Sequence, residues 1–220
     1  MNEQKRPMPT PDSLSHPSLS LARSQSNAEQ EAASRQTVYL SFHDVINPQT
    51  TNRFIGACND ILNRQLATDI YVLFSSAGGA VECGVTLYNY LRALPIPLTM
   101  HNIGSVDSIA TAVFMAGQRR FAASASCFLF HGINWTFQAP TSTTYFQLTE
   151  ICNRVGALSQ VVQRIITKNS KLTEAELLHL FVKGKTETPD FALAKGIIHE
   201  IREVGLPPTP LIFNISEGKA

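Results

Sequence analysis

The chain has 220 residues, of which 44% are hydrophobic and 16% are charged, and its formal net charge is +1. This length fits one domain with an additional tail, and the apolar fraction is sufficient for a sizeable core. The near-neutral charge gives no support for a protein that binds nucleic acid or an anionic membrane. The sequence has no apolar run of about 18 residues and no signal-peptide core, so it predicts no membrane span, and we expect a cytoplasmic protein.

Four cysteines occur, and none of them forms a Cys-x-x-Cys pair. They are Cys58, Cys83, Cys127 and Cys152, each in an apolar context. We expect them to be small buried hydrophobic residues, and we expect neither a disulfide framework nor a metal site.

The composition divides the chain into three parts. Residues 1–36 are rich in Ser, Pro, Gln, Asn and Ala, and such a segment cannot bury enough apolar surface to offset the entropy of ordering, so we predict a disordered N-terminal tail. Residues 37–205 are predicted to form the folded domain. The proline-containing end, residues 206–220, is predicted to be an extended C-terminal tail.

Apolar strands alternate with amphipathic helices through the first part of the domain. The predicted elements are a strand at 38–42, a helix that begins at Asn47 and Pro48, a strand at 69–74, a helix at 81–94, a strand at 98–103, a helix from Ser108 to about Gly117 and a strand at 127–131. A repeated β-α order predicts an α/β fold with a parallel sheet and right-handed crossovers.

The second part of the domain reads as mainly helical. A long helix is predicted at 143–168, with an apolar stripe wider than one packed face needs. A capping box at Thr173 predicts a short helix, Thr188 and Pro189 predict another, and a last short strand is expected near residue 201. The pair at residues 119–120 is expected to lie in a solvated turn.

Three chemically distinctive motifs fall at the carboxyl ends of predicted strands, where ligand sites of parallel sheets lie. They are Gly78 with Gly79, then Ser108, then His131. A serine hydroxyl needs an adjacent base to act as a nucleophile, and the start of a helix offers unpaired N–H groups for a developing negative charge. His101 is a rival base, but its place inside a strand predicts a structural role.

With these motifs in place, the chain resembles the proteolytic subunit of the Clp protease (ClpP) over about residues 38–201. Four segments are similar to family motifs in the family's order: residues 75–79 (Ser-Ser-Ala-Gly-Gly), 103–108 (Ile-Gly-Ser-Val-Asp-Ser), 128–131 (Phe-Leu-Phe-His) and 194–198 (Ala-Lys-Gly-Ile-Ile). The resemblance implies a ClpP/crotonase-type fold with repeated β-α units, a parallel sheet and a long protruding helix.

The resemblance also implies a function and roles for single residues. It implies a serine endopeptidase that hydrolyses peptide bonds through an acyl-enzyme on Ser108, with His131 as the general base. The backbone N–H groups of Gly78 and Ile109 would form the oxyanion hole, which requires hydrogen-bond donors close to the oxygen that becomes negatively charged. No cofactor, metal or nucleotide is implied for this chain.

The third member of the family's catalytic triad, an aspartate, has no counterpart at the matching position, which is Gly184. The acid holds the imidazole tautomer and stabilises the imidazolium, so its loss is expected to reduce activity without abolishing it. Glu187, Asp190 or Asp107 could supply the carboxylate instead.

The resemblance implies a peptide or unfolded-protein substrate and a homo-oligomeric ring. The N-terminal segment lacks the family's axial-loop sequence, so partnership with a Clp-type ATPase stays open. One alternative is a catalytically weak or inactive ClpP-like subunit with a structural or modulatory role. Another is a crotonase-type acyl-CoA enzyme, which a serine with a distant histidine fits poorly.

Overall fold

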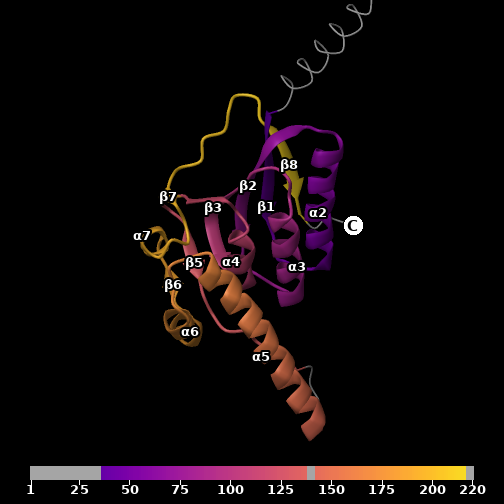
Figure 1. Cartoon of the computed structure of the whole chain (residues 1–220), viewed down its shortest axis with the longest axis vertical. Helices are drawn as coiled ribbons and strands as arrows, with labels where there is room; N and C mark the ends of the chain where they lie inside the picture. The colour runs from indigo at the N-terminus through magenta and orange to yellow at the C-terminus, as the bar shows by residue number, and fades with distance from the viewer. Residues whose placement is uncertain (1–35, 138–141, 217–220) are drawn as a thin grey trace, which may run out of the picture. The chain divides into compact units, whose positions relative to one another are not determined.

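The centre of the fold is three parallel strands, β1 (Gln36–His43), β2 (Ala67–Ser76) and β3 (Leu98–Asp107). The computed structural model describes residues 36–137 and 142–216 (Figure 1). The N-terminal tail predicted for residues 1–36 therefore lies outside the described residues, apart from its last residue. Buried hydrophobic side chains line all three strands, which is typical of strands in a parallel sheet.

The remaining strands extend this sheet on both sides. They are β4 (Arg119–Ala122), β5 (Cys127–Leu129), β6 (Thr186–Glu187), β7 (Glu200–Ile201) and β8 (Leu211–Ile215). The order is β6-β5-β3-β2-β1-β8, with β4 paired to β3 and to β7. Every pairing is parallel except that of β5 with β6. The predicted α/β fold is confirmed, with one antiparallel strand added at an edge.

Strand β8 corrects the prediction for the C-terminal end. The segment expected to be an extended tail, residues 206–220, contains a strand that pairs with β1 from Val38 opposite Leu211 to Phe42 opposite Ile215. The unpaired backbone groups along the edge of β1 provide the hydrogen bonds for this strand. Part of the predicted tail therefore belongs to the domain.

Six helices lie in the described ranges, and local sequence signals set where most of them start. They are α2 (Pro48–Asn63), α3 (Val81–Arg92), α4 (Ile109–Phe114), α5 (Tyr145–Lys168), α6 (Glu174–Lys183) and α7 (Pro189–Ala194). The Asn47 side chain caps α2, and the predicted capping box at Thr173 opens α6. Figure 1 shows α2 and α3 lying side by side over one face of the sheet.

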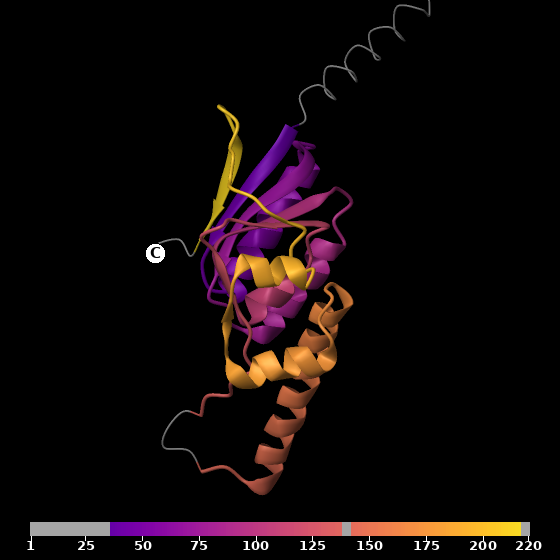
Figure 2. The same cartoon turned by 90° about the vertical axis from the view of Figure 1, so that its left-hand side faces the viewer.

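Helix α5 projects away from the sheet, as the resemblance implied (Figures 1 and 2). Its buried residues all lie in its last two turns. At its start, Tyr145 and Phe146 are 77% and 81% exposed. The described residues therefore bury only part of the wide apolar stripe of this helix.

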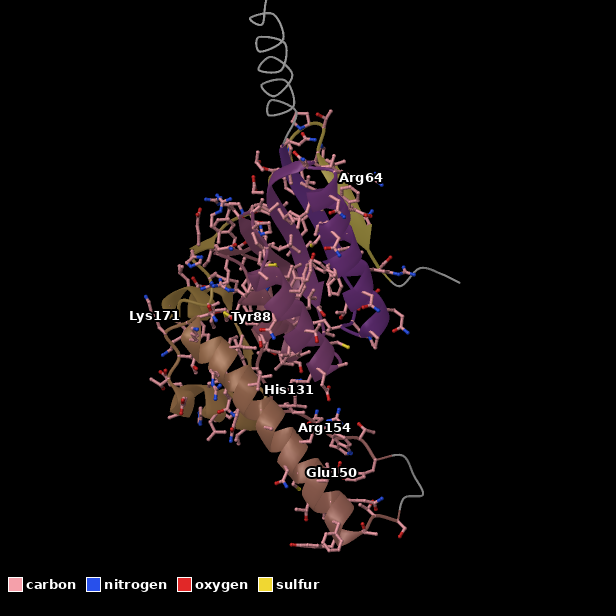
Figure 3. The ribbon with its side chains drawn as sticks, turned by 45° about the vertical axis from the view of Figure 1, so that its right-hand side comes forward. Arg64, Tyr88, His131, Glu150, Arg154 and Lys171 are labelled. Atoms are coloured by element: carbon pink, nitrogen blue, oxygen red, sulfur yellow. The ribbon has the colours of Figure 1, made fainter. Side chains whose placement is uncertain are left out.

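An ion pair links the projecting part of α5 to α3. Arg154 of α5 forms an ion pair with Glu82 in the first turn of α3, and its guanidinium lies 6.0 Å from the centre of the Trp135 ring (Figure 3). Both charged side chains are at least half exposed, so the pair adds only a weak contact between α5 and α3.

Arg120 is buried, which contradicts the expectation of a solvated turn. Only 7% of the residue is exposed, and it lies in β4. Its guanidinium donates hydrogen bonds of 2.7 to 3.1 Å to four backbone carbonyls, those of Gly117, Asn169, Gly196 and Ile197. These carbonyls follow the ends of α4, α5 and α7, where the helix dipoles are negative. The neighbouring Arg119 is exposed, as expected.

The cysteines do not share one environment. Cys58 is buried, and its burial raises the pKa of the thiol to about 12. Cys83 and Cys127 are half-buried, and Cys152 is exposed on α5. The expectation that all four would be buried is wrong for Cys152, because it lies on the half of α5 that projects beyond the sheet.

Candidate functional site

Ser108 stands at the sharp turn between β3 and α4. Its backbone has φ +56° and ψ −129°, a conformation that non-glycine residues rarely adopt and that costs conformational energy. Its N–H donates to the carbonyl of Leu129 on β5 at 2.9 Å, which holds the strained turn in place. The side chain does not cap α4. A strained serine with an uncommitted hydroxyl favours a chemical role over a capping role.

His131 follows β5 directly and is half-buried. Its Nδ1 lies 2.7 Å from the carbonyl oxygen of Gly132. A carbonyl can only accept, so Nδ1 carries the proton and Nε2 is left with a free lone pair. This is the tautomer that a general base requires. Figure 3 shows His131 next to α5.

Ser108 and His131 line the same small hollow, although they are 23 positions apart in the chain. The other lining residues are apolar: Val81, Ile109, Ile133, Val162 and Phe181. Both polar residues are described, and no hydrogen bond joins their side chains. Catalytic hydrogen bonds often tighten only when substrate binds, so the shared hollow is the relevant observation.

Gly78 is packed against the turn that holds Ser108. Its φ is +89°, and a β-carbon built on it would fall 2.7 Å from the β-carbon of Ser108 and 3.4 Å from the backbone nitrogen of Ile109. Ile109 is the first residue of α4, so its N–H has no intrahelical acceptor. The two predicted oxyanion donors thus flank Ser108. The Gly78 N–H already donates to the hydroxyl of Ser76 at 3.1 Å.

None of the three candidate acids contacts His131 within the described residues. Asp107 accepts a hydrogen bond from the Ser105 hydroxyl. Glu187 is buried, and its carboxylate pairs with Lys185 at 3.1 Å. Asp190 is exposed in the first turn of α7. The structure therefore brings serine and histidine together without a carboxylate on the imidazole.

Gly184, the position expected to match the family's aspartate, ends α6 just before the strand that pairs with β5. Leu129 of β5 is paired with Thr186 of β6 in antiparallel register. Continuing that register by two residues brings His131 level with Gly184. A β-carbon added to Gly184 would meet nothing within 4 Å, so the space for a side chain is open. A side chain at position 184 would therefore meet no steric obstacle from its first carbon.

His101, the rival base, has the structural role predicted for it. It is fully buried on β3, and its two ring nitrogens bond the Tyr71 hydroxyl at 2.7 Å and the Arg202 carbonyl at 2.8 Å. Burial lowers the pKa of this imidazole. Both ring nitrogens are occupied, so His101 is not free to accept a proton from a serine.

The site walls formed by Val162 of α5 and Phe181 of α6 were not predicted from sequence. Both belong to apolar helical stripes that look like ordinary core positions, and only the packing of those helices brings them to Ser108.

Within residues 36–137 and 142–216, no cluster of three or more metal-ligating side chains occurs. The same ranges contain no helix with the length and apolarity needed to cross a membrane.

Comparison with known proteins points to one family. The Clp protease family model matches residues 27–204. Among curated relatives, the chain is 25% identical to ATP-dependent Clp protease proteolytic subunit 2 of Pseudomonas aeruginosa, over 63% of this chain and 70% of the relative. It is 22% identical to the ATP-dependent Clp protease proteolytic subunit of Cyanophora paradoxa, over 76% and 84% of the two chains, and 22% identical to that of Deinococcus radiodurans, over 71% and 76%. With its α/β fold and its Ser108–His131 hollow, the chain belongs to the Clp protease family as a divergent, ClpP-like member.

Proposed function

We propose that this protein is a serine peptidase in which Ser108 attacks a peptide carbonyl and His131 is the general base. The observation that supports the proposal best is the shared hollow, where a strained serine with an uncommitted hydroxyl meets a half-buried imidazole. Family membership makes peptide hydrolysis the reaction to expect from such a pair.

In the proposed mechanism, Nε2 of His131 takes the proton of the Ser108 hydroxyl as the Oγ–carbon bond forms. The Ile109 N–H and the Gly78 N–H then stabilise the negative oxygen, and Gly78 must first release its hydrogen bond to Ser76. The protonated imidazole gives its proton to the leaving amine, and water hydrolyses the acyl-enzyme by the same steps in reverse.

The carbonyl of Gly132 can perform one of the two roles of a triad acid, which are to hold the imidazole tautomer and to stabilise the imidazolium. It holds the Nδ1–H tautomer of His131, because it accepts that proton at 2.7 Å. It carries no full negative charge, so it stabilises the imidazolium less than a carboxylate does. Loss of the acid from a serine protease triad lowers kcat by up to about 10⁴, a figure that includes loss of the tautomer that the Gly132 carbonyl holds here. We therefore propose an enzyme that is slow in this form.

We propose peptides or unfolded protein as substrates and a homo-oligomeric ring as the assembly, both in keeping with the family. The exposed aromatic residues Tyr145 and Phe146 at the start of α5 provide an apolar surface that a second copy could cover.

The second candidate function is that of a catalytically inactive subunit that modulates or completes a ClpP-like assembly. The observation that favours it is that none of the acids Asp107, Glu187 and Asp190 reaches His131. The two candidates differ in one measurable property, the reactivity of Ser108.

Labelling with a fluorophosphonate serine-hydrolase probe distinguishes these candidates, since it needs an activated serine but no particular peptide. We expect labelling of the wild type and its loss in Ser108→Ala and His131→Ala. The matched control is His179→Ala, because His179 is exposed on α6 and should leave labelling unchanged. A folded, oligomeric wild type that does not label would support the inactive-subunit function instead.

A further inference from the structure

The hollow beside Ser108 is small and apolar. Its free space is about 10 Å³, which is about the room that one water molecule needs. An acyl group bonded to Ser108 would lie beside these walls. The size of the hollow therefore bears directly on which substrates react.

Phe181 is the bulkiest of the walls, and the backbone around it is tied to the site. Its carbonyl accepts a hydrogen bond of 3.3 Å from the N–H of Gly132, the residue next to the general base. The Phe181 side chain also packs against the hydrophobic core. Another wall, Val162, is buried in that core near the end of α5. Neither wall can move away without loss of packing contacts.

We propose that Phe181 restricts Ser108 to acyl groups with small side chains, of the size found in alanine or glycine. This inference rests on the proposed function, because it requires a reactive Ser108. A benzyl or isobutyl side chain is much larger than the free space of about 10 Å³ in the hollow that Phe181 lines. Apolar pockets typically discriminate by one to two orders of magnitude per size step of this kind, so we expect a preference of about 10-fold or more.

The test compares two activated esters that share a leaving group and differ only by a phenyl ring, p-nitrophenyl propanoate and p-nitrophenyl 3-phenylpropanoate. Their acyl groups correspond to alanine and phenylalanine without the amino group. In each reaction the bond from Ser108 Oγ to the acyl carbon forms and the bond to the aryl oxygen breaks. The serine proton goes to His131, and p-nitrophenolate leaves.

The readouts are the rate of p-nitrophenolate release and the mass of the peptide that contains Ser108. We expect the wild type to acylate at least about 10-fold faster with the propanoate. Phe181→Ala should bring the two rates close to each other by accelerating the larger ester. Leu178→Ala is the matched control, since Leu178 is exposed on the same helix and should keep the wild-type ratio.

If the alanine variant is too unstable to purify, Phe181→Val also enlarges the hollow and can be tested in its place. The inference is wrong if the wild type reacts equally well with both esters, or if a folded Phe181 variant keeps the wild-type ratio. Those outcomes leave Ser108 acylated and the proposed peptidase intact. If neither ester acylates Ser108 and the fluorophosphonate probe does not label it, the proposed function itself fails and the inference fails with it.

Discussion

Gly78 lies directly against Ser108, so that a β-carbon at position 78 would fall 2.7 Å from the β-carbon of the serine and 2.8 Å from the carbonyl oxygen of Asp107. Real β-carbons essentially never come within 3.0 Å of atoms in residues that are not their chain neighbours. The φ of +89° at Gly78 is also one that L-residues rarely adopt. The predicted oxyanion hole therefore requires a residue without a side chain at position 78.

Gly78→Ala is expected to displace the Ser108 turn and to lower the rate of fluorophosphonate labelling by about 100-fold or more, the range measured for the loss of one oxyanion donor. The control is Gly56→Ala in α2, where an added β-carbon meets nothing within 4 Å. Labelling kinetics and thermal unfolding of both variants test this. A Gly78→Ala protein that labels at the wild-type rate would contradict the proposed oxyanion hole.

Gly184→Asp is expected to increase peptidase activity and serine labelling, by about 10-fold or more. The new carboxylate would occupy the open space level with His131 and stabilise the imidazolium. The φ of +58° at this position is one that Asp and Asn tolerate better than most residues. Gly184→Asn is the matched control, since it has the same shape without the charge. Equal activity of the two variants would show that position 184 does not act on the base.

Arg120→Met is expected to lower the free energy of unfolding by about 3 kcal/mol or more, because it leaves two buried and two half-buried carbonyls without this donor. Arg119→Met is the neighbouring control: its guanidinium is exposed and lies 3.8 Å from Asp69, a pair worth less than about 1 kcal/mol. Urea unfolding of both variants measures the difference. Similar losses in the two would show that the four hydrogen bonds of Arg120 contribute little.

Stability should fall as the pH drops below the ordinary pKa of histidine, because two imidazoles are held neutral in the folded state. Burial lowers the pKa of His101, whose Nδ1 accepts a hydrogen bond from the Tyr71 hydroxyl. The pKa of His199 is lowered mainly by partial loss of solvent around its ring and, to a smaller extent, by the positive charge of Arg120. His199 accepts the backbone N–H of Arg120 through Nδ1, a bond that protonation breaks. The unfolded chain then binds more protons than the folded chain, so acid favours unfolding.

The measurement is the midpoint of thermal unfolding between about pH 7.5 and about pH 5, the range in which histidine titrates. We expect the double variant His101→Gln/His199→Asn to be less stable at neutral pH and to lose less stability on acidification than the wild type. His179→Gln, at an exposed position on α6, should follow the wild-type curve. Parallel curves for all three proteins would refute the contribution of His101 and His199.

Replacing both Tyr145 and Phe146 by serine is expected to give a smaller assembly without unfolding the domain, because these side chains are exposed at the start of α5 and contribute little to the core. Light scattering and circular dichroism together separate assembly from folding. Val182→Ser is the control, since Val182 is 80% exposed on α6. An unchanged mass for the double variant would place the self-association surface elsewhere.

Much of the fold follows from short stretches of sequence. The helix starts at Asn47 and Thr173 were predictable because capping depends on hydrogen bonds over three residues. Alternation of apolar strands and helices predicted a parallel sheet, and parallel topology places the carboxyl ends of neighbouring strands at one edge. That is why Ser108 and His131 could be expected in one site before the structure was known.

The tertiary structure alone decided the features that depend on residues far apart in the chain. Nothing near Arg120 in sequence indicates that three helix ends would supply its acceptors, and nothing near Leu211 indicates that the edge of β1 would bind it as a strand. The same holds for Phe181, which reads as an ordinary apolar position of α6 and becomes a wall beside Ser108. Local sequence determines backbone propensity and caps, whereas contacts between distant segments determine which charges are buried and how much space the site leaves for a substrate.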